Sequence, residues 1–194
     1  SSRLALNQRK LDRHGHRFHS RRHHDGARVM IPTSALSAIG WPPDASAPCL
    51  DEGERLARVI EQHRNAFIVH DGQTPQRAEA PRGLIPDEDD QLVRPSVGGW
   101  VVAENGAPLT LKRLLPRRNV LRRGAAGEAF REQVLAANLD LAIVVMGLDG
   151  DYSPRRLERY LTLIGSAAIP ALVVLSKADR YEEATERRAT IQTL

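Results

Sequence analysis

Short β-like runs separated by turn signals dominate the chain between residues 50 and 116. Asn105-Gly106 lies between two such runs, a pattern typical of a hairpin. Five short strands are predicted, at residues 56–60, 66–69, 84–85, 99–103 and 109–111. Five strands in a segment of this size match a small Greek-key barrel of the OB type. Residues 36–116 are therefore predicted to form an OB-fold domain, with Trp41 and Trp100 in its core.

The hydrophobic pattern changes after Pro116. Residues 128–137 have apolar side chains at helical spacing, which predicts an amphipathic helix. Residues 139–148 then form a nearly continuous apolar run, as expected of a strand that is covered on both faces.

A helix and a second strand are predicted to follow. Ser153-Pro154 combines a capping hydroxyl with a proline in the first turn, which indicates a helix start. Residues 171–175 form a second apolar strand, and residues 182–194 a further helix. Strand, crossover helix and strand make a βαβ unit with a parallel sheet. A single such unit cannot cover both faces of its sheet, so residues 117–194 are predicted to be the first part of an α/β domain.

The composition is that of a globular protein, with 41% hydrophobic and 27% charged residues. The chain contains no apolar run of about 18 residues, so no membrane span and no membrane partner are predicted. Cys49 is the single cysteine, which excludes an internal disulfide and a cysteine-cluster zinc site and fits a reducing compartment. The expected location is the cytoplasm.

Most of the positive charge lies in the first 30 residues. They hold eight basic and two acidic residues, a balance of +6, whereas the remaining 20 basic and 22 acidic residues give −2, which together make the net charge of +4. Residues 1–35 are predicted to be a disordered tail rich in Arg and His, because they offer little apolar area to bury. A phosphate-attracted arm and a histidine metal site are the alternatives for this tail.

The tetrapeptide Ser176-Lys177-Ala178-Asp179 directly follows the second apolar strand. Open α/β sheets bind ligands at this edge, and the four residues resemble the [NT]KxD guanine-specificity motif of GTPases. The carboxylate of Asp179 can accept two hydrogen bonds from guanine that adenine cannot donate, and the stem of Lys177 can lie along the base. Ser176 replaces the usual Asn. Alone, the match is weak, since a solvated lysine and a helix-capping aspartate give the same pattern.

Further motifs support the guanine assignment by their order along the chain. They are Val97-Gly98-Gly99-Trp100-Val101, the arginine-rich segment 114–123, Ala136-Ala137-Asn138-Leu139-Asp140, Asp149-Gly150-Asp151-Tyr152-Ser153 and Arg159-Tyr160-Leu161. Together with the tetrapeptide they resemble the circularly permuted GTPases of the ribosome small-subunit-dependent GTPase A (RsgA/YjeQ) family, over residues 36–194. The family usually has an aspartate where this chain has Gly99.

The resemblance implies a cytoplasmic, monomeric GTPase that binds the small ribosomal subunit and its rRNA and acts late in subunit maturation. It implies GTP as the ligand, with Mg and Zn expected only in the full-length protein. In this family the phosphate-binding loop follows the guanine motif, and no GxxxxGK[ST] sequence occurs in the 194 residues. The chain alone is therefore predicted to contain no catalytic residue and to hydrolyse no GTP.

Six basic residues with no acid between them are predicted to contact RNA: Lys112, Arg113, Arg117, Arg118, Arg122 and Arg123. Guanidinium groups suit phosphate oxygens, and each neutralised phosphate releases counterions. A solvated connector would have the same composition. Two rival functions remain, a non-enzymatic OB-fold RNA-binding protein with a degenerate α/β appendage and a different enzyme on a doubly wound sheet.

Overall fold

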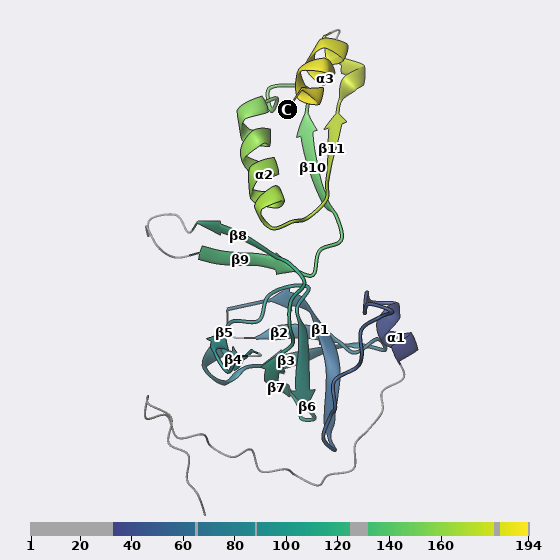
Figure 1. The fold of residues 1–194 in the computed structure, drawn as a ribbon, viewed down its shortest axis with the longest axis vertical. Helices are drawn as coiled ribbons and strands as arrows, with labels where there is room; N and C mark the ends of the chain where they lie inside the picture. Colours follow the sequence, from purple (N-terminus) through teal and green to yellow (C-terminus); the bar gives the residue numbers. More distant parts are fainter. Residues whose placement is uncertain (1–32, 65, 88, 125–131, 181–182, 194) are drawn as a thin grey trace, which may run out of the picture.

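Five strands close into a barrel at one end of the molecule (Figure 1). The structure is a computed structural model and describes residues 33–64, 66–87, 89–124, 132–180 and 183–193. The barrel strands are β1 (Glu54–Gln62), β2 (Phe67–His70), β3 (Pro75–Glu79), β6 (Trp100–Glu104) and β7 (Leu109–Leu114). Their order around the barrel is β1-β2-β3-β7-β6, and β1 also pairs with β6. The β3–β7 pairing is parallel and the others are antiparallel.

The sequence predicted four of the five barrel strands and misassigned the remaining one. Residues 84–85, predicted as a barrel strand, begin the separate hairpin of β4 (Ile85–Pro86) and β5 (Leu92–Val93). The missed barrel strand is β3, which begins with a proline and buries only Ala78. The sequence of β3 has almost no alternation of apolar and polar residues. Its place in the sheet therefore depends on backbone pairing with β2 and β7.

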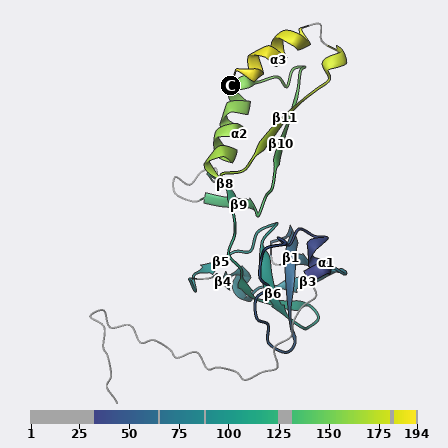
Figure 2. The same cartoon turned by 45° about the vertical axis from the view of Figure 1, so that its right-hand side comes forward.

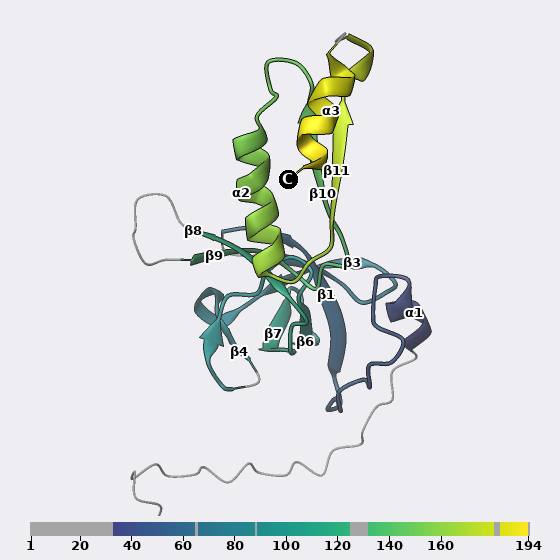
Figure 3. The same cartoon turned by 45° about the horizontal axis from the view of Figure 1, so that its top comes forward.

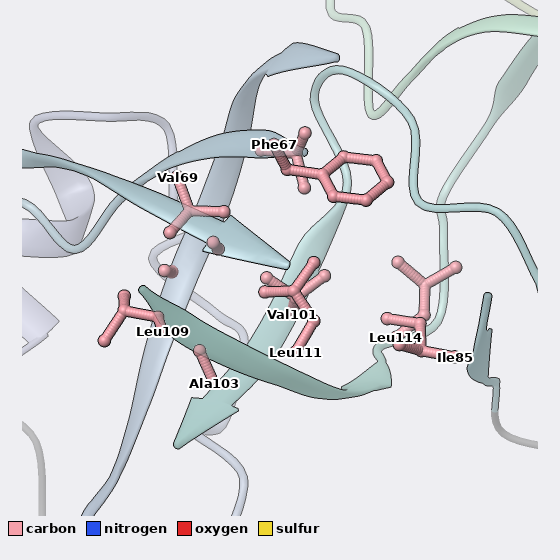
Figure 4. Packing of buried hydrophobic residues seen from close by; sticks show 11 residues of the cluster. Phe67, Val69, Ile85, Val101, Ala103, Leu109, Leu111 and Leu114 are labelled. Atoms are coloured by element: carbon pink, nitrogen blue, oxygen red, sulfur yellow. The ribbon is translucent and has the colours of Figure 1, made fainter. Parts of the chain in front are cut away.

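Strands β1 and β6 bury side chains on both of their faces. Ala57, Val101 and Ala103 belong to the cluster inside the barrel, part of which is drawn in Figure 4. The alternate residues Leu56 and Val102 face the opposite way, into a second cluster with Leu36, Trp41, Leu50 and Trp100. That outer cluster is covered by the segment that starts with helix α1 (Thr33–Ser37). The two tryptophan rings meet edge to face, with centroids 4.8 Å apart, which confirms their predicted place in the core.

A two-stranded antiparallel sheet follows the barrel. It consists of β8 (Val120–Gly124) and β9 (Glu132–Ala137). The helix predicted for residues 128–137 is therefore wrong over residues 132–137, and residues 125–131 lie outside the described part. Alanine, leucine and glutamine favour helices, but helix propensity is a weak predictor, and here the pairing with β8 overrides it.

The βαβ unit extends away from the barrel, with β8 and β9 between them (Figures 1 and 2). Strands β10 (Ala142–Gly147) and β11 (Ala171–Ser176) pair in parallel, and helix α2 (Pro154–Ser166) connects them. Helix α2 buries Leu157 and Ile164. Helix α3 (Ala184–Gln192) follows β11, and Figure 3 shows it at the far end of the unit from the barrel. The predicted fold class, an OB-type barrel followed by part of an α/β domain, is confirmed.

A dense set of hydrogen bonds joins the barrel to the second half of the chain. The backbone N–H of Ala137 donates to Val97 O at 2.9 Å, and the amide of Asn138 donates to Gly98 O at 3.0 Å. Arg58, on β1, donates across to Asn138 O at 3.2 Å, and its guanidinium is also held by Ile39 O, before the barrel, at 2.5 Å. Burial lowers the pKa of the Arg58 guanidinium, although arginine stays protonated in proteins. We call these contacts the joint.

The predicted tail lies mostly outside the described part of the chain. Residues 1–32 are not described, and residues 33–35 belong to helix α1. Among the described helices, none is long and apolar enough to span a membrane.

Candidate functional site

The tetrapeptide 176–179 lies at the carboxyl edge of the parallel sheet, where the sequence predicted it. Ser176 is the last residue of β11 and is aligned with Gly147, the last residue of β10. The backbone N–H of Leu148 donates to Ser176 O at 3.0 Å, so the chain leaving β10 stays beside the motif. Because β10 and β11 end at aligned residues, the loops that follow them lie together at one edge of the sheet. Open α/β sheets bind ligands at this edge.

The backbone turns sharply at Lys177. Its φ is +61°, in the left-handed region that non-glycine residues seldom adopt. Asp179 follows in a short 3₁₀ turn, η2 (Ala178–Arg180). Its side chain is exposed, and no described residue engages its carboxylate by a hydrogen bond or ion pair. The carboxylate therefore points to solvent at the sheet edge and is available to a ligand.

Lys177 is paired with a residue to which sequence reasoning gave no role. Its ammonium donates to the Asp149 carboxylate, from the loop after β10. The hydrogen bond from Lys177, helped by the backbone N–H of Asp151, holds the pKa of Asp149 below its ordinary value. The spacing of 28 residues between the partners carries no sequence signal. In the sequence, Asp149 stood out only as the first residue of the motif 149–153, directly after the apolar run 139–148.

The six basic residues predicted to contact RNA do not form a single connector. Lys112 and Arg113 lie in β7, Arg117 and Arg118 follow it, and Arg122 and Arg123 lie in β8. A bulge in the β6–β7 pairing exposes both Lys112 and Arg113, which are sequence neighbours in one strand.

Several of these cations contact other parts of the chain. Lys112 pairs with Glu104 at 2.9 Å, and Arg118 pairs with Asp140 at 2.5 Å. Arg113 donates to Cys49 O at 2.9 Å, and Arg123 donates to the side-chain oxygen of Gln133 at 3.2 Å. The six cations have no acid between them in the sequence, but in three dimensions acids from β6 and from the β9–β10 connection pair with Lys112 and Arg118.

Arg122 and Arg123 border a polar hollow of about 300 Å³ between β8 and the end of α2. Ser166 and Ala167 line its other side. Lys112 and Arg113 border a second hollow, of about 370 Å³, but Asp87 and Asp90 also line that one. The hollow beside Arg122 and Arg123 has no acid among its described lining residues and can take an anionic group.

Metal ligands are not assembled in the described ranges. No group of three His, Cys, Asp or Glu side chains there is arranged to hold a metal ion. The residues described here thus do not fit a resident Mg or Zn ion, and neither ion is assigned to them.

Comparison with known proteins gives a consistent family. Residues 114–194 match the family model of RsgA GTPase. A small ribosomal subunit biogenesis GTPase RsgA from Xanthomonas campestris pv. campestris (strain B100) is 40% identical over 174 residues, which covers 82% of this chain and 46% of the relative. The protein of the same name from Xylella fastidiosa (strain 9a5c) is 44% identical over 153 residues, covering 74% of this chain and 44% of the relative. The chain thus spans about half the length of these curated relatives.

Solved structures agree on the fold. YloQ, described as a circularly permuted GTPase, has a TM-score of 0.50 at 21% identity and covers 73% of this chain and 47% of its own. YjeQ from Thermotoga maritima has a TM-score of 0.50 at 19% identity, with 71% and 46% covered. The family model over residues 114–194 and the curated relatives at 40% and 44% identity point to the same family, and we conclude that the chain belongs to the RsgA GTPase family.

Proposed function

We propose that this chain recognises the guanine base of GTP and contributes that half of the nucleotide site to a GTPase acting in small ribosomal subunit biogenesis. The observation that carries the proposal is the exposed Asp179 carboxylate at the carboxyl edge of the β10–β11 sheet, which no described residue engages. Names of the curated relatives, which are small ribosomal subunit biogenesis GTPases, support the biological setting.

Each motif residue has a distinct part in the proposed site. Asp179 accepts hydrogen bonds from the ring N–H and the exocyclic amino group of guanine. Lys177 lays its aliphatic stem along the base, while Ser176 and Ala178 shape the loop. A site that hydrogen-bonds particular ligand groups strongly rejects analogues that lack them, so this arrangement selects guanine over adenine.

In this proposal, these 194 residues alone do not hydrolyse GTP. They contain no GxxxxGK[ST] sequence, and the backbone amides and lysine of that loop are what hold the β- and γ-phosphates. We therefore expect the chain alone to bind guanine nucleotides weakly and to show no GTPase activity.

The test is a change of base preference in the protein made from the complete reading frame. In Asp179→Asn the side-chain amide pairs with the carbonyl that xanthine has in place of the amino group. We expect GTP affinity to fall about 10- to 100-fold and XTP affinity to rise. Glu186→Gln, an exposed acid on α3, serves as the control and leaves the preference for GTP unchanged. An Asp179→Asn protein that still prefers GTP over XTP contradicts the proposal.

We further propose that the basic strands contact rRNA of the small subunit. Support comes from the position of Arg122 and Arg123 beside the polar hollow and from the affinity of guanidinium groups for phosphate.

Salt titration of rRNA binding tests this second proposal. Replacing both Arg122 and Arg123 by alanine is expected to weaken binding and to flatten the plot of log K against log salt by about one for each lost contact. Arg77→Ala removes an exposed arginine of β3 that is paired with Glu79 and is expected to leave the slope unchanged. Equal effects of the two changes contradict the assignment.

The rival function, an RNA-binding protein without nucleotide chemistry, differs in one measurable respect. It predicts rRNA binding that is insensitive to GTP, whereas the GTPase proposal predicts that nucleotide changes the affinity of the complete protein for the subunit. The proposal also implies a monomer that acts in the cytoplasm.

A further inference from the structure

The loop that follows β10 lies against the guanine motif and is anchored by a carboxylate. One oxygen of Asp149, Oδ2, receives the ammonium of Lys177, and the other, Oδ1, accepts the backbone N–H of Asp151 at 3.1 Å. Both carboxylate oxygens are thus engaged. The Asp149 side chain is 25% exposed, against 49% for Lys177, so the carboxylate lies on the protein side of the ion pair.

The end of β10 leaves room for this carboxylate because it is a glycine. A Cβ atom added at Gly147 would lie 2.5 Å from Asp149 Oδ1 and 3.6 Å from Asp151 Cβ. Any side chain at position 147 would therefore push the carboxylate off the strand end. The absence of a side chain at Gly147 thus leaves the space that the Asp149 carboxylate occupies.

Three further contacts hold the loop that carries Asp149. From α3, Arg187 donates to Leu148 O, and its guanidinium lies 5.0 Å from the centre of the Tyr152 ring. The Tyr152 hydroxyl donates in return to Arg187 O at 3.2 Å. Residues on either side of Asp149 are thus tied to the helix that follows the guanine motif, so the carboxylate is held by the fold.

We propose that Asp149 is a positioning residue for base recognition, and this inference rests on the function proposed above. By holding the ammonium, Asp149 fixes the four-carbon stem of Lys177 at the sheet edge, where the stem forms one wall of the base site. A free lysine side chain loses considerable rotamer freedom when it is immobilised by a ligand. Pairing with Asp149 restricts that freedom before the nucleotide arrives, which makes binding tighter.

The experiment compares two aspartates of the same loop in the protein made from the complete reading frame. Asp149→Asn removes the charge that holds Lys177, and we expect the dissociation constant for GDP to rise about 3- to 10-fold. Asp151→Asn makes the same chemical change two residues away, where the carboxylate pairs with Arg156 at 2.7 Å, and is expected to change GDP affinity less than about twofold. Circular dichroism and urea unfolding of both variants show whether each is folded.

A double-mutant cycle separates positioning from a general structural role. Lys177→Met keeps the apolar stem and removes the ammonium, so adding Asp149→Asn to it is expected to have no further effect on GDP affinity. Effects that add fully in the double variant would overturn the inference, because Asp149 would then act independently of Lys177.

Failure of the inference and failure of the proposed function give different results. If the unsubstituted protein binds GDP no better than ADP, the proposed function fails and the role of Asp149 with it. If it prefers GDP and Asp149→Asn keeps that affinity within about twofold, the inference alone is wrong.

Discussion

Strand β6 of the barrel and strand β10 of the βαβ unit are similar in sequence and differ in burial. Both are short apolar strands with a Val-Val pair. In β6, Val101 and Val102 are each 0% exposed, whereas in β10 Val145 is 63% exposed and Ile143 is 58% exposed. An apolar run thus predicts that a strand is suited to burial on both faces, but the neighbouring elements decide whether both are covered.

The difference lies in what covers each face. The barrel closes on itself inside, and the segment that begins with α1 covers β1 and β6 outside. The β10–β11 sheet has α2 on one face, and on the other Leu172 and Val174 are exposed together with Ile143 and Val145. This agrees with the expectation that one βαβ unit leaves a sheet face open. Four predictions, from the largest expected effect to the smallest, test the contrast.

Truncation of a large side chain inside the barrel should have the largest effect. Phe67 is 1% exposed and belongs to the inner cluster, so Phe67→Ala is expected to lower the free energy of unfolding by about 3–5 kcal/mol. Both tryptophans lie in the outer cluster around the barrel, so their fluorescence during urea unfolding reports this region. A loss below about 1 kcal/mol would mean that the barrel core is loosely packed.

A substitution at Gly98, in the joint between the barrel and β9, should destabilise the protein nearly as much as Phe67→Ala. The φ of Gly98 is +85°, and an added Cβ would lie 2.0 Å from Ala137 O, so Gly98→Ala combines backbone strain with a clash. We expect a loss of about 2–4 kcal/mol in unfolding free energy. Gly53 is the matched control, since its φ is +84° with nothing within 4 Å of the added atom, and Gly53→Ala should cost about 1–2 kcal/mol. Equal losses at the two glycines would show that the close approach to β9 is not maintained in solution.

A pH-dependent contribution is expected from Asp71, at the β2–β3 turn. Burial works to raise the pKa of its carboxyl, but backbone N–H groups of Gln73 and Thr74 and the charge of Arg55 outweigh it, and the pKa is lowered. A carboxyl with a depressed pKa stabilises the fold above its unfolded pKa of about 3.9 and loses that contribution as the pH falls through its folded pKa.

The substitution Asp71→Asn should therefore lower stability at pH 7 by about 1–3 kcal/mol. The deficit relative to the unsubstituted protein is expected to shrink on acidification below about pH 4. Urea unfolding of both proteins from pH 7 to pH 3 measures it. A deficit that stays constant over this range would show that the ionised carboxylate is not the stabilising form.

The smallest effect is expected on the open face of β10. Val145→Ala removes two methyl groups that are largely exposed and should change the unfolding free energy by less than about 0.5 kcal/mol. Hydrogen exchange of the β10 amides in this chain measures the change locally. A loss above about 1.5 kcal/mol would mean that this face is covered in solution and that β10 resembles β6 after all.

The sequence predicted strands well where apolar residues were concentrated, as in β1, β6 and β11. Prediction from the sequence failed for strands that are held in the sheet by backbone pairing and bury few apolar side chains. Strand β3 buries only Ala78, and β9 is built from residues that prefer helices but pair with β8. Propensity is a local quantity, and such contacts across the chain override it.

The position of the candidate site could be predicted, but its supporting contacts could not. A motif directly after an apolar strand must lie at the carboxyl edge of a parallel sheet, so Ser176 and Lys177 were correctly located. The pairing of Lys177 with Asp149 depends on the register of β10 against β11 and on the space above Gly147. Similarly, the acids that pair with Lys112 and Arg118 lie 8 and 22 residues away in the sequence, outside the run of cations, so a charge count over that run does not reveal them.

Guanine recognition at the edge of the β10–β11 sheet is tested most directly by a nucleotide titration of the isotope-labelled chain, followed by NMR. We expect GDP at about millimolar concentration to shift the amide signals of Ser176 to Asp179 and of Asp149. Barrel residues such as Phe67 should not respond, and ADP should have no such effect. Equal shifts with ADP, or shifts confined to the barrel, would contradict guanine recognition at this edge of the sheet.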